Sequence, residues 1–243
     1  MKIIKFDLLP STNEYLKSLI ETSFLEDFSV VITSQQTSGK GQRGVKWKSE
    51  PHKNLTFSIY KIHHQLSVRS QFTLNMIVSL AVYKAISDLK IPDIKIKWPN
   101  DIMSANKKLG GILIENSIKS NQIKHSIIGI GLNINQTDFE NLPQASSLKN
   151  ITGMNYDLDI LLTSILNEIK SCFQFFESQK YDELKQKYLK HLYRINKVST
   201  FQSKEGIYFS GIIKSVNDYG LLIVKLENGK EKIFDIKEIK LMN

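Results

Sequence analysis

Residues 38–47 read SGKGQRGVKW, a stretch that contains three glycines and three cations and ends on an aromatic residue. Glycine permits backbone conformations with positive φ and lets N–H groups approach a ligand closely. Consecutive N–H groups can form a concave nest for an anion, and lysine or arginine adds full charge. The stretch therefore predicts a loop that holds a phosphate or a carboxylate, with Trp47 able to cover a ring. The alternative is a basic hairpin loop that binds nothing.

Two common glycine-rich motifs do not explain this loop. Its glycines match G-x-G-x-x-G, but a dinucleotide-binding motif needs a helix directly after the loop and an acidic residue about 20 positions further on. Here a strand-like run over residues 54–60 follows, and the first aspartate beyond the loop is Asp88. A protein-kinase loop needs His-Arg-Asp and Asp-Phe-Gly downstream, and neither tripeptide occurs.

Length and composition bound the class of protein. A chain of 243 residues that is 41% hydrophobic suits one large domain, or one medium domain with a small one. The N-terminus alternates instead of forming a signal peptide, and no apolar run approaches the roughly 20 residues of a membrane helix. The single cysteine, Cys172, excludes an internal disulfide and a cysteine-based metal site. We therefore expect a cytoplasmic protein with no membrane partner.

The net charge of +9 raises the question of a nucleic-acid partner. The lysines are scattered through every segment, and no helix-turn-helix or dense basic helix is present in the sequence pattern. We expect no nucleic-acid partner, since attraction to anionic small molecules or to an acidic protein is equally compatible with this charge.

The hydrophobic pattern predicts two regions of different character. It predicts strands over 2–9, 28–35, 54–60, 94–98, 102–104, 109–116 and 123–135, and helices over 11–21, 67–89, 157–178 and 181–191. Ser11, with Glu14 three residues later, matches a capping box at the first helix. From about Asn196, short strands alternate with turn sequences, which is typical of a small β-barrel of about five strands. We expect an α+β domain over residues 1–192 and a small C-terminal β-barrel domain over 193–243.

Five short motifs follow one another in the first of these regions. They are Ser-Thr-Asn at 11–13, the glycine loop at 38–47, Lys-Trp-Pro-Asn-Asp at 97–101, Lys-Leu-Gly-Gly-Ile-Leu-Ile-Glu at 108–115 and Gly-Ile-Gly-Leu-Asn-Ile-Asn at 129–135. Their order and spacing resemble the biotin protein ligases, which attach biotin to carboxylases. The resemblance runs from about Phe6 to Asn135 and continues weakly to the C-terminus. It implies a class II synthetase-like biotin/lipoate ligase catalytic domain, with a mixed β-sheet flanked by helices, and a C-terminal barrel of the Src-homology-3 type.

The resemblance also implies a reaction in two steps, with ATP and biotin as substrates and Mg²⁺ present. The biotin carboxylate attacks the α-phosphate of ATP to give biotinyl-5′-AMP and pyrophosphate. A lysine of a biotin carboxyl carrier protein or domain then takes the biotinyl group and releases AMP. No protein nucleophile is needed, which agrees with the absence of a Ser-His-Asp or Cys-His signature. A homodimer is compatible with the resemblance.

The resemblance assigns roles by position. The biotin-binding residues would be Ser11, Thr12, Asn13, Gln36, Lys40, Gly41, Gln42, Lys108 and Gly111. The residues for ATP and the adenylate would be Gly39, Lys40, Arg43, Trp47, Asn100, Asp101, Lys108 and Asn133. Lys108 and Arg43 would be the catalytic cations, and Asp101 would be a ligand for magnesium. Simpler structural interpretations exist for several of them, since Ser11 and Thr12 can serve as a helix cap and Asp101 as a turn residue.

The chain departs from the family pattern in two places. Lys40, Gln42 and Val45 stand where the family loop usually carries arginine, and Gln42 and Val45 bring no charge. We expect Lys40, Arg43 and Lys46 to compensate. Only ten residues precede Ser11, which is too few for the DNA-binding domain of bifunctional members, so the monofunctional type is expected.

Three alternative functions remain open. A lipoate–protein ligase shares the fold and the adenylate chemistry, although the pairing of the glycine loop with Lys-Trp-Pro-Asn-Asp favours biotin. A non-catalytic biotin-binding module would not need several cations in one site. A nucleic-acid-binding module lacks its usual domain, and a DNA affinity that falls steeply with salt would favour it.

Overall fold

A seven-stranded mixed sheet forms the larger part of the molecule. The computed structural model describes residues 1–140, 142–177 and 180–242, and the side chains of Arg43 and Glu177 lie outside that description. The strand order is β1-β2-β3-β7-β6-β5-β4, with β1 parallel to β2 and the other neighbours antiparallel. The strands are β1 (Ile3–Leu9), β2 (Ser29–Gln36), β3 (Asn54–Ser67), β4 (Ile94–Lys97), β5 (Asp101–Ser104), β6 (Lys107–Lys119) and β7 (Gln122–Asn133). The predicted α+β fold with a mixed sheet is confirmed.

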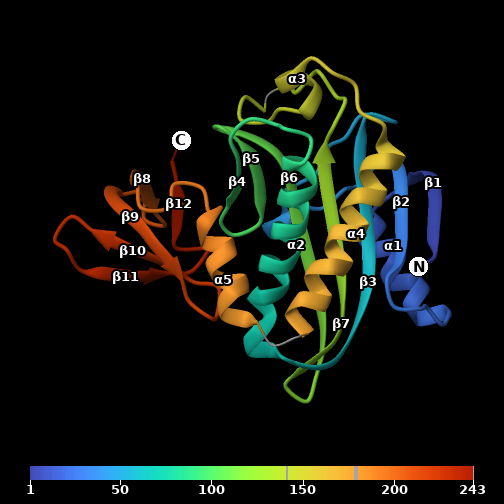
Figure 1. Ribbon diagram of the computed structural model, residues 1–243, viewed down its shortest axis with the longest axis horizontal. Helices are drawn as coiled ribbons and strands as arrows, with labels where there is room; N and C mark the ends of the chain where they lie inside the picture. The colour runs from blue at the N-terminus through green and yellow to red at the C-terminus, as the bar shows by residue number, and fades with distance from the viewer. Residues whose placement is uncertain (141, 178–179, 243) are drawn as a thin grey trace.

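Helices pack against one face of this sheet and enclose the main hydrophobic core (Figure 1). They are α2 (Gln71–Ser87), α4 (Leu158–Glu177) and α5 (Tyr181–Lys190). Alternate residues of β3, such as Leu55, Phe57 and Ile59, point to this side and are buried in the core. The sequence spacing of Phe72, Met76, Ser79/Leu80, Tyr83 and Ile86/Ser87 predicts a single core-facing stripe on α2. Ala81 and Val82 lie outside this stripe and are also fully buried. The reason is that α2 packs against the sheet, α4 and α5 together.

The opposite face of the sheet is only partly covered. The helix α1 (Thr12–Thr22) packs there over a small apolar cluster that includes Leu16, Val31 and Tyr60. Towards the ends of β2, β3 and β7 this face carries polar or small residues, among them Thr56 and Gly131. The sheet thus has an apolar face under the helices and a more polar face beside α1.

The C-terminal region forms a second, antiparallel sheet. Its strands are β8 (Val198–Ser203), β9 (Tyr208–Val216), β10 (Leu222–Leu226), β11 (Glu231–Phe234) and β12 (Ile239–Leu241). The five strands that the turn sequences predict are present, but the order β11-β10-β9-β8-β12 leaves β11 and β12 as edges in the described chain. The predicted barrel is therefore an open sheet. It meets the larger sheet where Trp98 Nε1 donates a hydrogen bond to the carbonyl of Gly220, 2.8 Å away.

Two boundaries differ from the sequence prediction. The strand β3 continues to Ser67, and the helix expected from that residue begins at Gln71 after a 3₁₀ turn (Val68–Ser70). The sequence pattern predicts no helix between residues 135 and 157, but α3 (Leu148–Thr152) lies there. That helix has only five residues, with Ser147 as its N-cap and Gly153 in the left-handed conformation at its end, so it lacks the length that makes periodicity visible.

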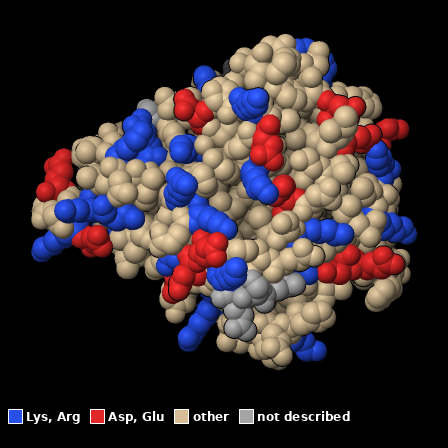
Figure 2. Space-filling model, in the orientation of Figure 1, with Lys and Arg blue, Asp and Glu red and all other residues tan. Residues whose placement is uncertain are grey.

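Charged side chains of the described residues form no dominant patch on the helical face. Figure 2 shows acidic and basic side chains interspersed across this face, in agreement with the scattered lysines of the sequence. Among the described residues, no helix is both long enough and apolar enough to span a bilayer.

Candidate functional site

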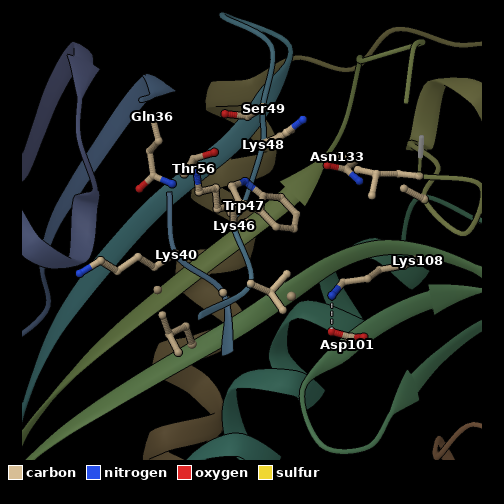
Figure 3. A pocket seen from close by; sticks show the side chains of 18 of the residues that line it. Gln36, Lys40, Lys46, Trp47, Lys48, Ser49, Thr56, Asp101, Lys108 and Asn133 are labelled. Atoms are coloured by element: carbon tan, nitrogen blue, oxygen red, sulfur yellow. Dashed lines mark ion pairs between the residues drawn. The ribbon is translucent and has the colours of Figure 1, made fainter. Parts of the chain in front are cut away.

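A cavity of about 670 Å³ opens on the polar face of the large sheet, next to α1. Its walls come from the start of α1, the end of β2, the glycine loop, β3, the β5–β6 hairpin, β7 and the segment 136–145. The predicted site residues along it are Ser11, Thr12, Asn13, Gln36, Lys40, Gly41, Gln42, Trp47, Asn100, Asp101, Lys108, Gly111 and Asn133. Residues from all five motifs therefore line one cavity. Figure 3 shows Lys40, Asp101, Lys108 and Asn133 around it.

One end of the cavity is neutral and polar. Ser11 caps α1, with its Oγ 3.5 Å from the backbone N–H of Glu14. The backbone N–H of Thr12 donates to Gln36 Oε1 at 2.8 Å, and Thr12 Oγ1 donates to the same oxygen at 3.2 Å. Ser11 is therefore a helix cap, as the simpler structural interpretation predicts. The capped start of α1 places Thr12 against Gln36.

Asn13 lines the cavity, but its side-chain atoms are engaged by the protein. Its Oδ1 lies 2.6 Å from Ser58 Oγ, and its Nδ2 donates to Glu115 Oε2 at 2.6 Å. A side chain at Gly129 on β7 would collide with the Asn13 amide. The glycine therefore provides the space that Asn13 occupies, and Asn13 ties α1 to the sheet.

The glycine loop is a hairpin. Gly41 N–H donates to the carbonyl of Val45 at 2.7 Å, Trp47 N–H donates to that of Gly39 at 2.9 Å, and a 3₁₀ turn (Gln42–Gly44) forms the tip. Gly39 is not among the residues along the cavity, but a Cβ there would lie 2.6 Å from Gln36 Nε2. The predicted catalytic role of Arg43 falls on a side chain outside the described residues.

Lys40 is directed towards α1, away from Lys108 (Figure 3). Its Nζ lies 3.1 Å from Glu14 Oε1, and Lys17 contacts both Glu14 and Glu115. Hydrogen bonds from Lys17 and then Lys40 hold the pKa of Glu14 below its ordinary value. A chain of alternating charges therefore connects the loop to the strand β6.

Lys108 and Asp101 form the charged centre of the cavity. Lys108 Nζ lies 2.7 Å from Asp101 Oδ1, across the β5–β6 hairpin (Figure 3). A Cβ built on Gly111 would lie 3.5 Å from each of these two atoms, so the glycine keeps the space beside the pair open. Asn100 is buried and donates through Nδ2 to the carbonyl of Ile112 at 2.6 Å, which fixes the turn before β5.

Trp47 gives the cavity an aromatic wall. A Cβ at Gly131 would lie 2.5 Å from Trp47 Cε2, so the indole rests directly on the backbone of β7. Asn133 donates to the carbonyl of Ser146 at 3.1 Å and anchors the end of the 136–147 segment. Trp47 Nε1 and Thr56 Oγ1 are buried and have no hydrogen-bond partner among the described residues.

Sequence reasoning missed part of the cavity wall. The missed residues include Thr56, Gly129, Gly131, Gln136, Phe139, Leu142 and Gln144. For Thr56 a signal is present, because Asn54, Thr56 and Ser58 alternate with apolar residues along one strand. The segment 136–145 has no periodic pattern, and only the folded chain brings it to the site.

Comparisons with known proteins identify relatives along most of the chain. The model of the biotin/lipoate A/B protein ligase family matches residues 5–133. The bifunctional ligase/repressor BirA of Bacillus subtilis is 25% identical over 96% of this chain and 72% of its own length. The Escherichia coli protein of the same name is 27% identical over 71% of this chain and 53% of its own length. A solved structure, the biotin protein ligase from Aquifex aeolicus in complex with biotin and ATP, superposes with a TM-score of 0.80 at 24% identity, over 99% of this chain and 98% of its own. That structure has the same fold.

Proposed function

Because the chain belongs to the biotin/lipoate A/B protein ligase family, we propose that it is the enzyme that activates biotin with ATP and transfers it to a carrier lysine. The observation that carries this proposal is the set of groups that meet in one cavity. Thr12 and Gln36 supply neutral polar groups, Lys108 and Asp101 form an ion pair, and Trp47 supplies an indole. These groups suit the ureido ring, the carboxylate–phosphate junction and the adenine of biotinyl-5′-AMP.

The neutral end suits the ureido ring of biotin. Ser11, Thr12 and Gln36 supply hydroxyl and amide groups there, and the ring needs both donors and acceptors.

The first chemical step joins two anions. A carboxylate oxygen of biotin attacks the α-phosphorus of ATP, and the bond from that phosphorus to the pyrophosphate oxygen breaks. Lys108 balances the charge that develops at this junction, because its Nζ lies beside the open space kept by Gly111. Asp101 holds the ammonium in place until the substrate anions arrive.

The cavity wall also offers protection to the adenylate. Trp47 and Asn133 enclose the adenine, and the glycine hairpin with the 136–145 segment covers the mixed anhydride. Exclusion of water matters because hydrolysis of the adenylate would waste ATP. In the second step the acceptor lysine amine attacks the acyl carbon, AMP leaves and an amide forms.

Magnesium fits this site in only one way. Among the described residues there is no cluster of three or more acidic, histidine or cysteine side chains. Magnesium is commonly bound through one or two carboxylates together with substrate phosphates. The acidic residues along the cavity are Glu50, Asp101, Asp138 and Glu140, and Asp101 is the one that lies beside Lys108. Asp101 would hold the ion, which would screen the phosphate charge.

The acceptor is a biotin carboxyl carrier domain, which the names of the relatives support. A protein from Mycobacterium tuberculosis named biotin–[acetyl-CoA-carboxylase] ligase is 27% identical over 66% of this chain. A homodimer remains part of the proposal, and its test is the mass of the protein in solution.

Isotope exchange separates this proposal from a lipoate ligase. Labelled pyrophosphate should enter ATP when biotin is present and should not do so when lipoate replaces it. Exchange that requires lipoate would assign the lipoate chemistry, and the absence of exchange with either acid would contradict an adenylating enzyme.

A further inference from the structure

The turn between β9 and β10 contacts the larger sheet close to the candidate site. Trp98 Nε1 donates to the carbonyl of Gly220 in this turn, at 2.8 Å. Gly220 has a φ of +84°, and a Cβ there would collide with the Phe72 ring of α2. Glycine is therefore required twice, for the left-handed backbone and for the close approach to α2. The packing on α2 fixes the carbonyl that Trp98 meets.

This turn has a defined shape and is also attached to α5. Asn217 Oδ1 accepts hydrogen bonds from two backbone N–H groups of its own turn, at 3.0 and 2.9 Å. Asp218 accepts a hydrogen bond from the Tyr181 hydroxyl at 3.0 Å and forms an ion pair of 2.7 Å with Lys185, and both partners belong to α5. The carbonyl of Gly220 is thus held by contacts with two helices.

Trp98 belongs to a short loop that leads into Asp101. The strands β4 and β5 are antiparallel, and Lys97 lies opposite Asp101 in their register, so three residues connect them. On one side Asn100 fixes this loop, because it exchanges hydrogen bonds with Ile112 of β6. On the other side, among the described residues, Trp98 attaches the loop to the second sheet. Because the loop is so short, a displacement of Trp98 would move Asp101 as well.

The contact is also part of a continuous hydrophobic core. Trp98 packs against the core beneath the helices. The same core includes Val216 and Leu222, which end β9 and begin β10 on either side of the turn. A shift of the β9–β10 turn is therefore transmitted to Trp98 by packing as well as by the hydrogen bond.

We propose that Trp98 is a positioning residue, through which the second sheet fixes the loop before Asp101 and thereby the Asp101–Lys108 pair. Asp101 Oδ1 lies 2.7 Å from Lys108 Nζ, so a displaced carboxylate would displace the ammonium. Trp98 is not among the residues along the cavity, so it acts through the loop and does not touch the substrates. This inference rests on the proposed function, since it concerns the pair that acts in the first step.

The second sheet offers a matched control for the turn. Asn228, in the turn between β10 and β11, uses its Oδ1 as Asn217 does and accepts a hydrogen bond of 3.0 Å from the backbone N–H of Lys230. Each asparagine shapes a turn of the same sheet, but the carbonyl that Trp98 meets belongs to the turn of Asn217. Asn228→Ala therefore removes a turn contact of the same kind without a path to Asp101.

The measurement is steady-state pyrophosphate exchange, together with the equilibrium affinity for biotin by calorimetry. Trp98→Phe keeps an aromatic ring in the core but removes the Nε1 donor. It should lower the exchange rate at saturating biotin and ATP about tenfold, because a charge at the reacting centre is misplaced. The biotin affinity should stay within about twofold, since Thr12 and Gln36 are untouched. Thermal unfolding checks that the variant is folded.

Asn217→Ala tests the turn without a change to Trp98. It should lower the rate at saturation about threefold, whereas Asn228→Ala should exchange at the wild-type rate. In a Trp98→Phe background, Asn217→Ala should cause no further loss, because the contact through which it acts is already gone. Additive losses in this cycle would overturn the inference. So would equal losses of rate in Asn217→Ala and Asn228→Ala.

The results separate this inference from the proposed function. A wild-type rate in folded Trp98→Phe would overturn the inference and leave the proposed function intact. A loss of biotin affinity as large as the loss of rate would also overturn it, because it would indicate a general disturbance of the cavity. If Trp98→Phe does not fold, the comparison of Asn217→Ala with Asn228→Ala decides the question. Wild-type protein without biotin-dependent exchange would contradict the proposed function and, with it, the inference.

Discussion

Lys108 Nζ lies 2.7 Å from Asp101 Oδ1, so the cation at the centre of the cavity already has a carboxylate partner within the chain. The two residues come from neighbouring strands of one hairpin, and neither is fully buried. Such a pair is held loosely enough to reorganise when a stronger anion arrives. The substrate carboxylate and phosphate would therefore draw the ammonium towards themselves while Asp101 limits where it can go.

The first prediction concerns Lys108. Lys108→Ala should lower biotin-dependent pyrophosphate exchange about 10²–10³-fold, since one preorganised charge at the reacting centre is removed. The exposed Lys119 on the same strand is the control, and Lys119→Ala should exchange at the wild-type rate. Exchange at the wild-type rate in Lys108→Ala would exclude the assigned role.

The second prediction concerns Asp101 and magnesium. Asp101→Asn should raise the Mg²⁺ concentration needed for half-maximal exchange, because the cavity carboxylate beside Lys108 is lost. The rate at saturating Mg²⁺ should recover in part. If the Mg²⁺ dependence does not change, Asp101 serves only as the partner of Lys108.

The third prediction concerns the glycine hairpin. Its internal hydrogen bonds and the Lys40–Glu14 contact give it some order of its own, so residues 37–47 should exchange amide hydrogens at an intermediate rate without substrates. Biotinyl-adenylate should slow that exchange. Glu14→Gln should speed amide hydrogen exchange of the loop in the free protein and have a smaller effect in the complex. Equal exchange rates of the loop in the free and the bound wild-type protein would argue against a loop that closes on the adenylate.

The fourth prediction concerns retention of the adenylate. If Lys40, Arg43 and Lys46 compensate for the neutral Gln42 and Val45, Arg43→Ala should release adenylate faster than Gln42→Ala does. A charge-assisted hydrogen bond of about 1.5–3 kcal/mol corresponds to roughly a tenfold to hundredfold change in the dissociation rate. The rate is measured by the loss of labelled adenylate from each variant. Faster release from Gln42→Ala would show that the amide makes the contact that matters.

The fifth prediction concerns pH and stability. Burial, with a smaller contribution from Lys61, lowers the pKa of His63 to about 4, whereas the unfolded value is near 6.5. Between these values the unfolded chain binds more protons, so this histidine makes the free energy of unfolding fall as pH falls from 6.5 towards 4. Denaturant unfolding measures the free energy of unfolding at pH 7 and at pH 4.5. Its decrease from pH 7 to pH 4.5 should be about 1–2.5 kcal/mol larger in wild type than in His63→Gln. The control is His64→Gln at the exposed neighbouring position, and a wild-type pH dependence in His63→Gln would refute the assignment.

The sequence predicts the large sheet and the position of the site better than the outer parts of the fold. Alternation along residues such as Ile94 and Ile96 is a local signal, because each strand has one face in the core. The sequence of α2 contains no local signal that residues such as Ala81 are buried, because their burial depends on the packing of α4 and α5 against α2. The same holds for the open second sheet, because its closure would require the edge strands β11 and β12 to pair, and they are distant in the sheet order.

The candidate site, like the fold, has some features that the sequence predicts and others that depend on contacts distant in the chain. Motifs such as Ser-Thr-Asn at 11–13 can be identified in the sequence, because their spacing is distinctive. Their partners cannot, since the contacts of Asn13 with Ser58 and Glu115 join residues 45 and 102 positions apart. The direction of Lys40 towards Glu14 also depends on how the hairpin folds over α1.

The most direct test of the central claim is transfer to a carrier domain, followed by intact mass. The purified chain, biotin, ATP and Mg²⁺ are mixed with a biotin carboxyl carrier domain and, in parallel, with the same domain lacking its acceptor lysine. The account predicts a mass gain of one biotinyl group on the intact carrier, which requires both ATP and biotin and which lipoate does not replace. No gain on the intact carrier, or an equal gain on the domain without the acceptor lysine, would contradict it.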